Sequence, residues 1–555
     1  MCLVLTERRR SLLGLTADSN ASFDPGGWLN PPLKSSRPLL NLQTYPRMNI
    51  YLEDETTGTL VVDAAISHTI GKPYCSTSED GFIGSSAAKF HFSVSRADNG
   101  AVLATSAEIL LNSTGTELAL PLSFFPARFE PYDIIIKTSA PHCDQVFEAK
   151  TQIYRLPRRT DGGSVARVDH LYGGLLFQNT STNPATWTPI FPYSFYVDWG
   201  SYLAGSTENV TKFADLGYNI IHPTPGGGNT PFNLDQFNTF LDIIESRGLW
   251  LMYDMRWTFK NLTSVAEQVN RLKARKSILL WYTGDEPDGQ ADPLNSTVLA
   301  YDQIKKLDPY HPTSLVLNCF NFYYEPYAAG ADIILADPYP VGQNATFSTL
   351  WNTPCNTTYG DCGCDDCNGN LRDVSTRMDT LAQYQLWLNA GPKSFWGVPQ
   401  AFGSSEYWSR PPTAKEEAVM AMLFINHNAK GIVAWNFPTT TELTAVTSAL
   451  AKVLSTQEIT GLLLGAKTQG LDFTGSSDLD VTGWTVGKKM LVSVVNIGTS
   501  VTPAEVDVKL PAKAKELRQV WPVEGFRGWV PTQVGMKKNG LADLEVNLLI
   551  VELDV

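Results

Sequence analysis

The chain has 555 residues, 43% of them hydrophobic and 18% charged. It is therefore too long for one hydrophobic core, and its composition excludes disordered and collagen-like classes. The formal charge of −13 argues against a nucleic-acid partner, because a phosphate backbone would be repelled. No run of about 18 apolar residues occurs, so we expect no membrane-spanning helix.

The N-terminal residues Met1 to Leu15 make a poor signal peptide, because Glu7 and three arginines interrupt their apolar stretches. The remaining sequence nevertheless indicates secretion. Acceptors of the form Asn-x-Ser/Thr exceed the roughly four that chance would give. They begin at Asn20, Asn112, Asn179, Asn209, Asn261, Asn295, Asn344 and Asn356.

Cysteine spacing supports the same compartment. Four of the eight cysteines crowd one loop rich in Gly, Asn and Asp, which indicates two disulfides in an oxidising environment; they are Cys355, Cys362, Cys364 and Cys367. A zinc site is the alternative, since Cys364 and Cys367 have a ligand-like spacing. Cys75 and Cys143 offer a further bridge within the first domain. We expect neither metal nor cofactor.

Residues 1–36 read as a lead-in segment rich in Ser, Pro and Gly. Residues 37–160 then contain short alternating runs separated by turns, such as Thr59–Ile66, Lys89–Val94 and Tyr132–Lys137. This pattern predicts an N-terminal antiparallel β-sandwich.

From residue 187 to 457 short apolar strands alternate with amphipathic helices, which predicts a (β/α)8 barrel of the TIM type. The expected strands are Pro192–Val197, Asn219–His222, Trp250–Asp254, Ile278–Thr283, Thr313–Leu317, Ile333–Ala336, Phe395–Val398 and Ile432–Trp435. The expected helices are Thr207–Leu216, Leu234–Arg247, Ser264–Ala274, Thr297–Lys306, Leu371–Asn389, Ala414–His427 and Leu443–Leu454. A doubly wound open sheet is the alternative, but no Gly-rich phosphate turn follows the first strand.

The cysteine-rich loop is an insertion at residues 345–370 of this barrel. From residue 458 to 555 the β pattern returns, as in Met490–Asn496 and Leu544–Val551, and predicts a C-terminal β-sandwich. The predicted fold class is therefore α/β plus all-β, with a barrel flanked by two sandwiches in a monomer.

In such a barrel the active site lies at the carboxyl ends of the strands. Cleavage of a glycosidic bond needs a protonated carboxyl group and a second carboxylate there. Glu286, in the turn after the fourth strand, is the expected proton donor, and burial beside Asp285 would raise its pKa. Pairing with an arginine or capping a helix is the alternative role of Glu286.

The turn Gly284-Asp285-Glu286-Pro287 resembles the strand-four Asn-Glu-Pro turn of clan A glycoside hydrolases, whose Glu is the acid/base. The ordered motifs Trp281–Gly289, Asp337–Pro340 and Gln400–Gly403 resemble a poorly characterised fungal and bacterial branch of these barrel enzymes. The resemblance covers residues 187–457. It implies a secreted hydrolase of O-glycosidic bonds in wall-type glycans, with poly- or oligosaccharide as substrate.

Two departures from that family pattern bear on the nucleophile. Asp285 stands where clan A enzymes usually carry Asn, and Gln400 stands where they carry the nucleophilic Glu. A neutral amide cannot attack an anomeric carbon, so Glu406 is the first alternative and Asp337 the second. Asp254 and Asp198 follow, with a structural role favoured for both.

Several further side chains at the strand ends are candidates for contact with a sugar. Aromatic rings stack on the apolar face of a pyranose, although many aromatic residues only fill cores. Arg256 pairs either with a substrate carboxylate or with Asp285 or Asp337, and His222 is either a base or a hydrogen-bonded core residue. The substrate-binding candidates are Asp285, Asp254, Trp257, Tyr282, Tyr339, Gln400, Trp408 and Trp435, with Trp199 as a further platform.

Two other classes of function stay open. One is a catalytically silent carbohydrate-binding barrel, which the missing strand-seven Glu favours. The other is a metal-dependent hydrolase, which the lack of a His-x-His pair at the strand ends disfavours. The sequence has no Gly-x-Ser-x-Gly turn, so a serine esterase is not expected.

Overall fold

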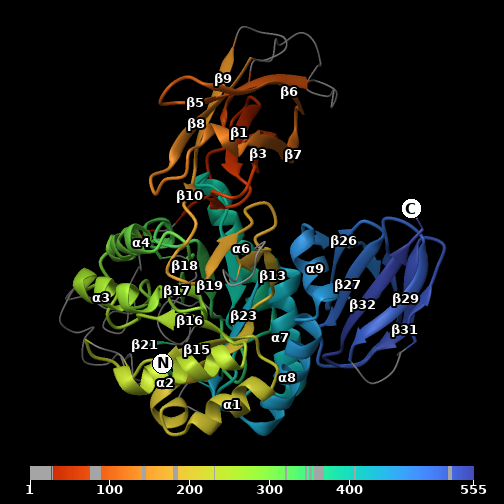
Figure 1. Cartoon of the computed structure of the whole chain (residues 1–555). Helices are drawn as coiled ribbons and strands as arrows, with labels where there is room; N and C mark the ends of the chain where they lie inside the picture. The colour runs from red at the N-terminus through yellow and green to blue at the C-terminus, as the bar shows by residue number, and fades with distance from the viewer. Residues whose placement is uncertain are drawn as a thin grey trace.

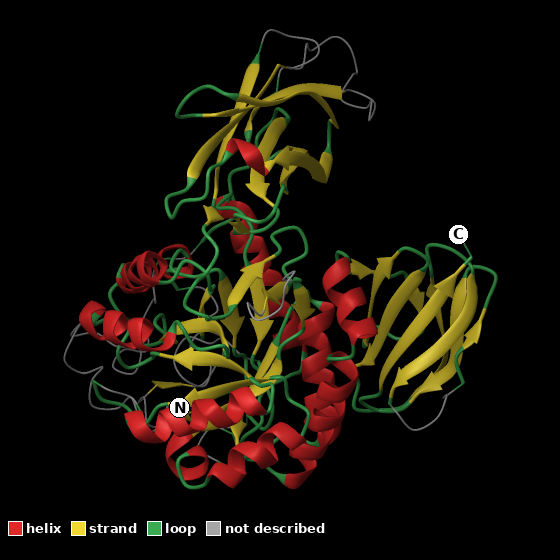
Figure 2. Ribbon diagram, viewed as in Figure 1, coloured by secondary structure: helices red, strands yellow, loops and turns green. Residues whose placement is uncertain are grey.

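The computed structural model describes residues 27, 29–74, 89–139, 145–178, 186–229, 232–318, 322–343, 347–348, 353–354, 368–404, 408–522 and 528–554. These residues form a central barrel with one β-sheet unit at each end of the chain (Figure 1). Figure 2 shows that helices surround the barrel strands, whereas the two terminal units consist almost wholly of strands.

Eight parallel strands close into a barrel in the order of the sequence, because β14 pairs with both β15 and β23. They are β14 (Tyr193–Asp198), β15 (Ile220–Thr224), β16 (Trp250–Asp254), β17 (Ile278–Asp285), β18 (Thr313–Leu317), β19 (Ile333–Ala336), β22 (Ser394–Gly397) and β23 (Ile432–Phe437). A helix follows each strand: α1 (Thr207–Asp215), α2 (Leu234–Ser246), α3 (Leu262–Leu272), α4 (Ser296–Leu307), α5 (Tyr324–Ala328), α6 (Arg372–Leu388), α7 (Ala414–Asn426) and α8 (Thr441–Leu454). The predicted barrel is confirmed, with the short helix α5 as an addition.

The barrel strands are apolar throughout because both of their faces are covered. All eight residues of β17 are buried, for example. Outward side chains pack against the helices in one cluster that includes Phe195, Trp281 and Phe424. Inward side chains form a second cluster that includes Met252, Leu280 and Trp396. The barrel interior is therefore a packed core, and chemistry is confined to its ends.

A small antiparallel sheet, unassigned from the sequence, covers the amino-terminal end of the barrel. Its strands are β11 (Val165–Val168), β12 (Leu175–Gln178) and β13 (Thr188–Ile190). Side chains of this sheet, among them Val168 and Leu175, belong to the same core cluster as the barrel interior. The sheet therefore closes the end opposite to the carboxyl ends of the strands.

The N-terminal unit is the predicted sandwich. One sheet has the order β4 (Lys72–Pro73), β1 (Leu39–Pro46), β3 (Thr57–Ser67) and β7 (Ser113–Pro121). The other has the order β6 (Val102–Leu110), β5 (Lys89–Arg96), β8 (Tyr132–Ser139) and β9 (Val146–Ile153). Inward residues of both sheets, such as Val62 and Ile136, share one core. A 3-10 turn (Leu122–Phe124) and the pair β2 (Tyr51–Leu52) and β10 (Arg155–Leu156) complete the unit.

The C-terminal unit also has two sheets around one core. One sheet has the order β24 (Gln469–Gly470), β26 (Leu479–Val486), β27 (Lys489–Asn496), β32 (Val546–Leu553) and β29 (Ala514–Trp521). The other has the order β25 (Phe473–Thr474), β28 (Thr502–Lys509), β31 (Gly535–Leu541) and β30 (Val530–Pro531). The segment expected to return to strands at residue 458 instead begins with helix α9 (Gln457–Gly465).

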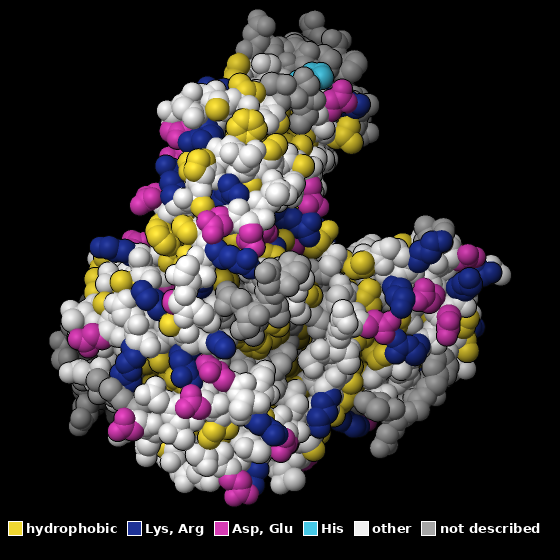
Figure 3. All heavy atoms as spheres, viewed as in Figure 1, with side chains coloured by type: hydrophobic (Ala, Val, Ile, Leu, Met, Phe, Trp, Pro, Cys, Tyr) yellow, Lys and Arg dark blue, Asp and Glu magenta, His cyan; other side chains and the backbone are white. Residues whose placement is uncertain are grey.

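The C-terminal unit shares the outer core of the barrel, since Trp484 and Ile550 belong to the barrel–helix cluster. The N-terminal sandwich stands on the barrel as a separate lobe, and charges of both signs are interspersed on the face that Figure 3 shows. The insertion contains a short pair, β20 (Phe347–Ser348) and β21 (Thr353–Pro354). All of the cysteines lie outside the described residues, so the disulfide and zinc alternatives remain predictions.

Candidate functional site

The strand-four turn is formed by an irregularity at the end of β17. The pairing of β17 with β18 shifts between Tyr282 and Asp285. Glu286 follows directly in the left-handed region, with φ of 51°, and its N–H donates to the carbonyl of Val316 at 3.2 Å. A non-glycine residue in this region is held there by its surroundings, and such residues cluster at functional sites.

Glu286 is hydrogen-bonded to Asp337, which directly follows β19. Both side chains are buried, with exposed fractions of 7% and 3%. Burial, together with repulsion from Asp285, raises the pKa of Glu286 to about 7. Burial and the nearby Glu286 raise the pKa of Asp337 well above its usual range. Two carboxyl groups this close cannot both ionise easily, so the pair holds a proton near neutral pH.

Arg256 lies beside this pair in a buried ion network. Its Nε donates to Asp254 Oδ2 at 2.7 Å and its Nη1 to Asp285 Oδ2 at 3.0 Å. Its guanidinium carbon also lies 5.5 Å from the centre of the Trp435 ring. Burial raises the pKa of Asp285 to about 6, although the positive charge of Arg256 opposes that rise. Of the alternatives for Arg256, the structure therefore shows the pairing with Asp285.

Two neighbouring groups extend the network. His222 Nε2 lies 2.8 Å from Asp254 Oδ2, and burial lowers the pKa of His222, so a neutral ring donates to the carboxylate. The Tyr282 hydroxyl donates to Asp285 Oδ1 at 2.6 Å, and the Tyr196 hydroxyl lies 3.2 Å from that of Tyr282. Asp254, His222 and Tyr282 are wholly buried, so they act by holding Asp285 and Arg256 in place.

Gln400 lies inside the protein and holds two loops together. Its Oε1 accepts from the N–H of Val341 at 2.8 Å, and its Nε2 donates to the carbonyls of Val341 and Phe402 at 3.0 and 3.2 Å. Because both amide protons are used and the side chain is fully buried, we correct the expected substrate contact of Gln400 to a structural role.

The predicted aromatic platforms divide into buried and half-buried rings. Tyr339 and Trp408 are mostly buried, and each packs edge-on against Phe402 at 5.0 and 4.8 Å. Trp257 and Trp435 are half-buried. Trp257 Nε1 donates to the carbonyl of Pro225 at 3.0 Å.

Two of the expected platforms are wrong. Trp199 packs against three phenylalanines of the outer core, the nearest being Phe232 at 5.1 Å. Tyr282 has no exposed surface. Trp257 and Trp435, together with Phe402, therefore keep part of their surface available to a ligand.

Glu406 lies outside the described residues, so its role stays a prediction. Asp198 caps the π-helix η6 (Trp199–Leu203), accepting from the N–H of Ser201 at 2.6 Å. Within the described ranges no cluster of three or more His, Cys, Asp or Glu side chains is arranged to hold a metal ion. No helix in the same ranges has the length and apolar character needed to cross a bilayer.

The chain matches no protein-family model and no curated protein sequence. Solved structures with a similar arrangement include an FMN-binding β-glucuronidase from Facaelibacterium prausnitzii L2-6, at 10% identity and a TM-score of 0.34 over 93% of this chain and 74% of that one. An α-amylase from Geobacillus thermoleovorans complexed with acarbose has 10% identity and a TM-score of 0.42, and the match covers 65% of this chain and 99% of the amylase. A GH30 endoxylanase from Clostridium papyrosolvens C71 has 12% identity and a TM-score of 0.41, and the match covers 65% of this chain and 96% of the endoxylanase. TM-scores this low decide neither family nor activity.

The sequence did not identify two buried side chains at this site. The hydroxyl of Tyr196 joins the network through Tyr282. Asp288 is buried, and its Oδ1 accepts from the N–H of Asn318 at 3.2 Å. In the sequence, only its position two residues after Glu286 indicated that Asp288 belongs to the site. Its burial was not expected, because a carboxylate in a turn usually faces water.

Proposed function

We propose that the protein is a glycoside hydrolase in which Glu286 donates the proton and Asp337 is the nucleophile. The observation that carries the proposal is the hydrogen-bonded carboxyl pair at the carboxyl ends of β17 and β19. A lone buried acid is a cost to stability, but two acids that hold a proton together supply both a donor and a carboxylate. In the free protein the shared proton lies nearer to Asp337, because the pKa of Asp337 is raised further than that of Glu286. The proposed reaction has this proton on Glu286 when the glycan is bound.

The proposed reaction proceeds in two steps. The Glu286 carboxyl proton passes to the glycosidic oxygen as the bond from that oxygen to the anomeric carbon breaks, and the Asp337 carboxylate bonds to that carbon. Water then attacks the same carbon, gives its proton to the Glu286 carboxylate and releases Asp337. We include retention of configuration in the proposal, because carboxyl groups in contact without a substrate are nearer to the roughly 5–5.5 Å of retaining pairs than to the roughly 6.5–9.5 Å of inverting pairs.

Two further features support Asp337 as the attacking group. Its Oδ1 is buried and has no hydrogen-bond partner among the described residues. The buried network around Arg256 holds Asp285 next to Glu286, and this neighbouring charge helps to keep Glu286 protonated.

The test compares Glu286→Gln and Asp337→Asn with Glu417→Gln as a matched control, since Glu417 is another buried glutamate with a raised pKa. Each site variant should lower kcat on an unactivated glycan by about 10³-fold or more, while the control stays near wild type. An aryl glycoside with a strongly acidic leaving group needs no proton donor, so Glu286→Gln should retain glycosyl-enzyme formation and Asp337→Asn should lose it. The reaction needs the pair with one proton, and the pair loses its protons in two steps, so wild-type activity should rise and then fall as pH increases.

Full activity of either site variant would refute these roles. The second candidate is a silent carbohydrate-binding barrel, which the structural role of Gln400 favours because it leaves strand seven without a carboxylate among the described residues. Binding of glycans without any hydrolysis by the wild type would establish that candidate instead.

Secretion belongs to the same proposal and is supported by the acceptor asparagines. Asn112, Asn261 and Asn295 are exposed, as attachment of a glycan requires. Secretion with glycosylation is tested on protein purified from its natural source. Enzymatic deglycosylation should lower its apparent mass on a denaturing gel.

A further inference from the structure

A cleft of about 1000 Å³ lies between the N-terminal sandwich and the barrel. The sandwich contributes β1 and β9 to its walls, and the barrel contributes the last turns of α4 and the segments that precede β19 and β22. This volume is at the upper end of the range for ligand-binding clefts, which form preferentially between domains. The cleft lies at the amino-terminal end of the barrel strands.

The cleft and the carboxyl pair are at opposite ends of the same strand. Asp332 lines the cleft just before β19, and Asp337 follows β19 at the other end. The four residues of β19 lie between them, so the two positions are five steps along the strand, or roughly 16 Å, apart. The amino-terminal end of such barrels does not carry catalysis, so a ligand in the cleft would be bound and not cleaved.

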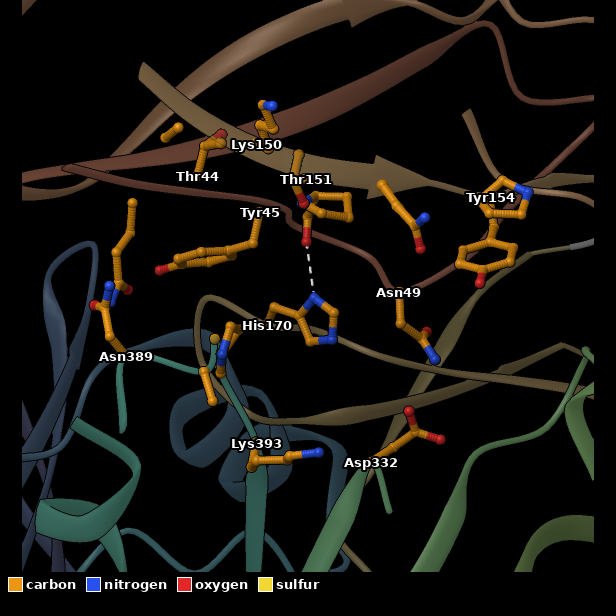
Figure 4. Close-up of a pocket in the computed structure, with 18 of the residues that line it drawn as sticks. Thr44, Tyr45, Asn49, Lys150, Thr151, Tyr154, His170, Asp332, Asn389 and Lys393 are labelled. Atoms are coloured by element: carbon orange, nitrogen blue, oxygen red, sulfur yellow. Dashed lines mark hydrogen bonds between the residues drawn. The ribbon is translucent and has the colours of Figure 1, made fainter. Parts of the chain in front are cut away.

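Both donors and acceptors line the cleft, and Figure 4 shows Asn49, His170 and Lys393 among them. His170 Nδ1 lies 2.9 Å from the carbonyl oxygen of Pro46 and donates to it, which leaves Nε2 as an acceptor. Lys393 donates one proton to the carbonyl of Ala331 at 2.5 Å and has two further protons to donate. Asn49 Oδ1 accepts from Val168, so its amide group remains a donor.

Two buried polar atoms on β1 lack partners. Asn41 Oδ1 and Thr44 Oγ1 have no hydrogen bond among the described residues, and both side chains line the cleft with exposed fractions of 7% and 8%. A buried polar group without a partner costs about 1–3 kcal/mol. Both oxygens have almost no accessible surface in this structure, so they lie behind the wall of the cleft and are not counted among its ligand contacts.

Charges of both signs line the cleft, with five lysines and three acids: Lys72, Lys150, Lys305, Lys306, Lys393, Glu148, Asp302 and Asp332. Lys305 is paired with Asp332 at 3.0 Å and Lys150 with Glu148 at 3.3 Å. Asp332 and the acceptor His170 Nε2 offset part of the attraction that these lysines have for an anion. Hydroxyl groups suit both kinds of partner because each one donates and accepts. The rings of Tyr45 and Tyr154 add apolar faces of the kind on which sugars stack.

We propose that this cleft is a second, non-catalytic carbohydrate site that holds a neutral oligosaccharide. It deepens the proposed function by giving the enzyme a place to hold a glycan chain away from the reacting bond. It does not depend on Glu286 or Asp337, so each of the two proposals can fail alone.

The test measures retardation of the whole protein in native gels containing laminarin, soluble xylan, soluble starch or polygalacturonate. All proteins carry Asp337→Asn to prevent hydrolysis. Thr151→Trp fills the cleft from β9 without removing a hydrogen bond, and Tyr154→Ala removes one of its rings. Val146→Trp, at the exposed end of the same strand and outside the cleft, is the matched control.

At least one neutral polysaccharide should retard the parent protein and the Val146→Trp control. Thr151→Trp and Tyr154→Ala should each weaken that binding by about tenfold or more, while thermal melting shows that both are folded. The proposal is overturned if no neutral polysaccharide binds, or if either folded cleft variant binds as the parent does. Binding of polygalacturonate alone would also overturn it, in favour of an anion site.

Discussion

Glu417 on α7 gives the clearest quantitative prediction. Its side chain is fully buried, and neither carboxyl oxygen has a hydrogen-bond partner among the described residues. Burial raises its pKa from 4.5 to about 8. The hydroxyl of Tyr193 is also buried and without a partner within the described ranges, and the charge of Glu417 would raise the pKa of Tyr193 further. Glu417 is therefore protonated in the folded protein at neutral pH.

The raised pKa links folding stability to pH with a definite sign. The unfolded chain loses this proton near pH 4.5, whereas the folded protein keeps it up to about pH 8. Between these values the unfolded state binds fewer protons, so stability falls by about 1.4 kcal/mol for each pH unit. The loss amounts to about 2.5 kcal/mol from pH 5 to pH 7 and to about 3.5 kcal/mol from pH 5 to pH 8.

Replacing Glu417 by Met keeps the length of the side chain and removes both the titration and the two oxygens without partners. The variant should match or exceed the wild type at pH 5, and its advantage should grow to a melting shift of roughly 2–5 °C at pH 7. Thermal unfolding of both proteins at pH 5, 6, 7 and 8 measures this difference, and other titrating groups cancel in it. Parallel pH profiles would refute the reasoning, because they would mean that Glu417 has an ordinary pKa.

Two substitutions at the rim of the barrel give further predictions. Arg256→Met leaves Asp254 and Asp285 without their buried partner and should lower the free energy of unfolding by about 3–5 kcal/mol near neutral pH. Chemical unfolding should show a smaller loss at low pH, where both acids are protonated. A loss that does not change with pH would contradict the ion-pair argument. Gln400→Glu replaces the amide that donates to Val341 and Phe402, so it should lower the melting temperature without raising kcat, and a gain in activity would show that strand seven needs a carboxylate.

The sequence predicted the barrel well because both of its periodic signals are strong. Three strands have the predicted bounds, Trp250–Asp254, Thr313–Leu317 and Ile333–Ala336. These runs are short, apolar and bounded by turns, and long amphipathic helices separate them. Helix α9 was missed because an apolar run such as Leu462–Leu464 beside glycines is compatible with either helix or strand.

The composition of the site could be predicted better than its contacts. The rule that chemistry lies at the carboxyl ends of barrel strands identified both Glu286 and Asp337. That rule does not give distances across the barrel mouth, which depend on strand stagger and on the left-handed backbone of Glu286. Glu406 therefore ranked above Asp337 as a nucleophile, although Asp337 is the acid that contacts Glu286 in the structure.

Glu417 also shows why a raised pKa does not define a catalytic site. Glu286 and Glu417 are both buried, and burial raises the pKa of each to a similar value. Glu417 lies on α7, and among the described residues neither of its carboxyl oxygens has a hydrogen-bond partner that could accept its proton. Glu286 lies at the end of a strand, with a hydrogen-bonded acid on one side and an arginine-held aspartate on the other. The chemistry therefore follows from the pair and its position, and the burial that both glutamates share contributes only the protonation state.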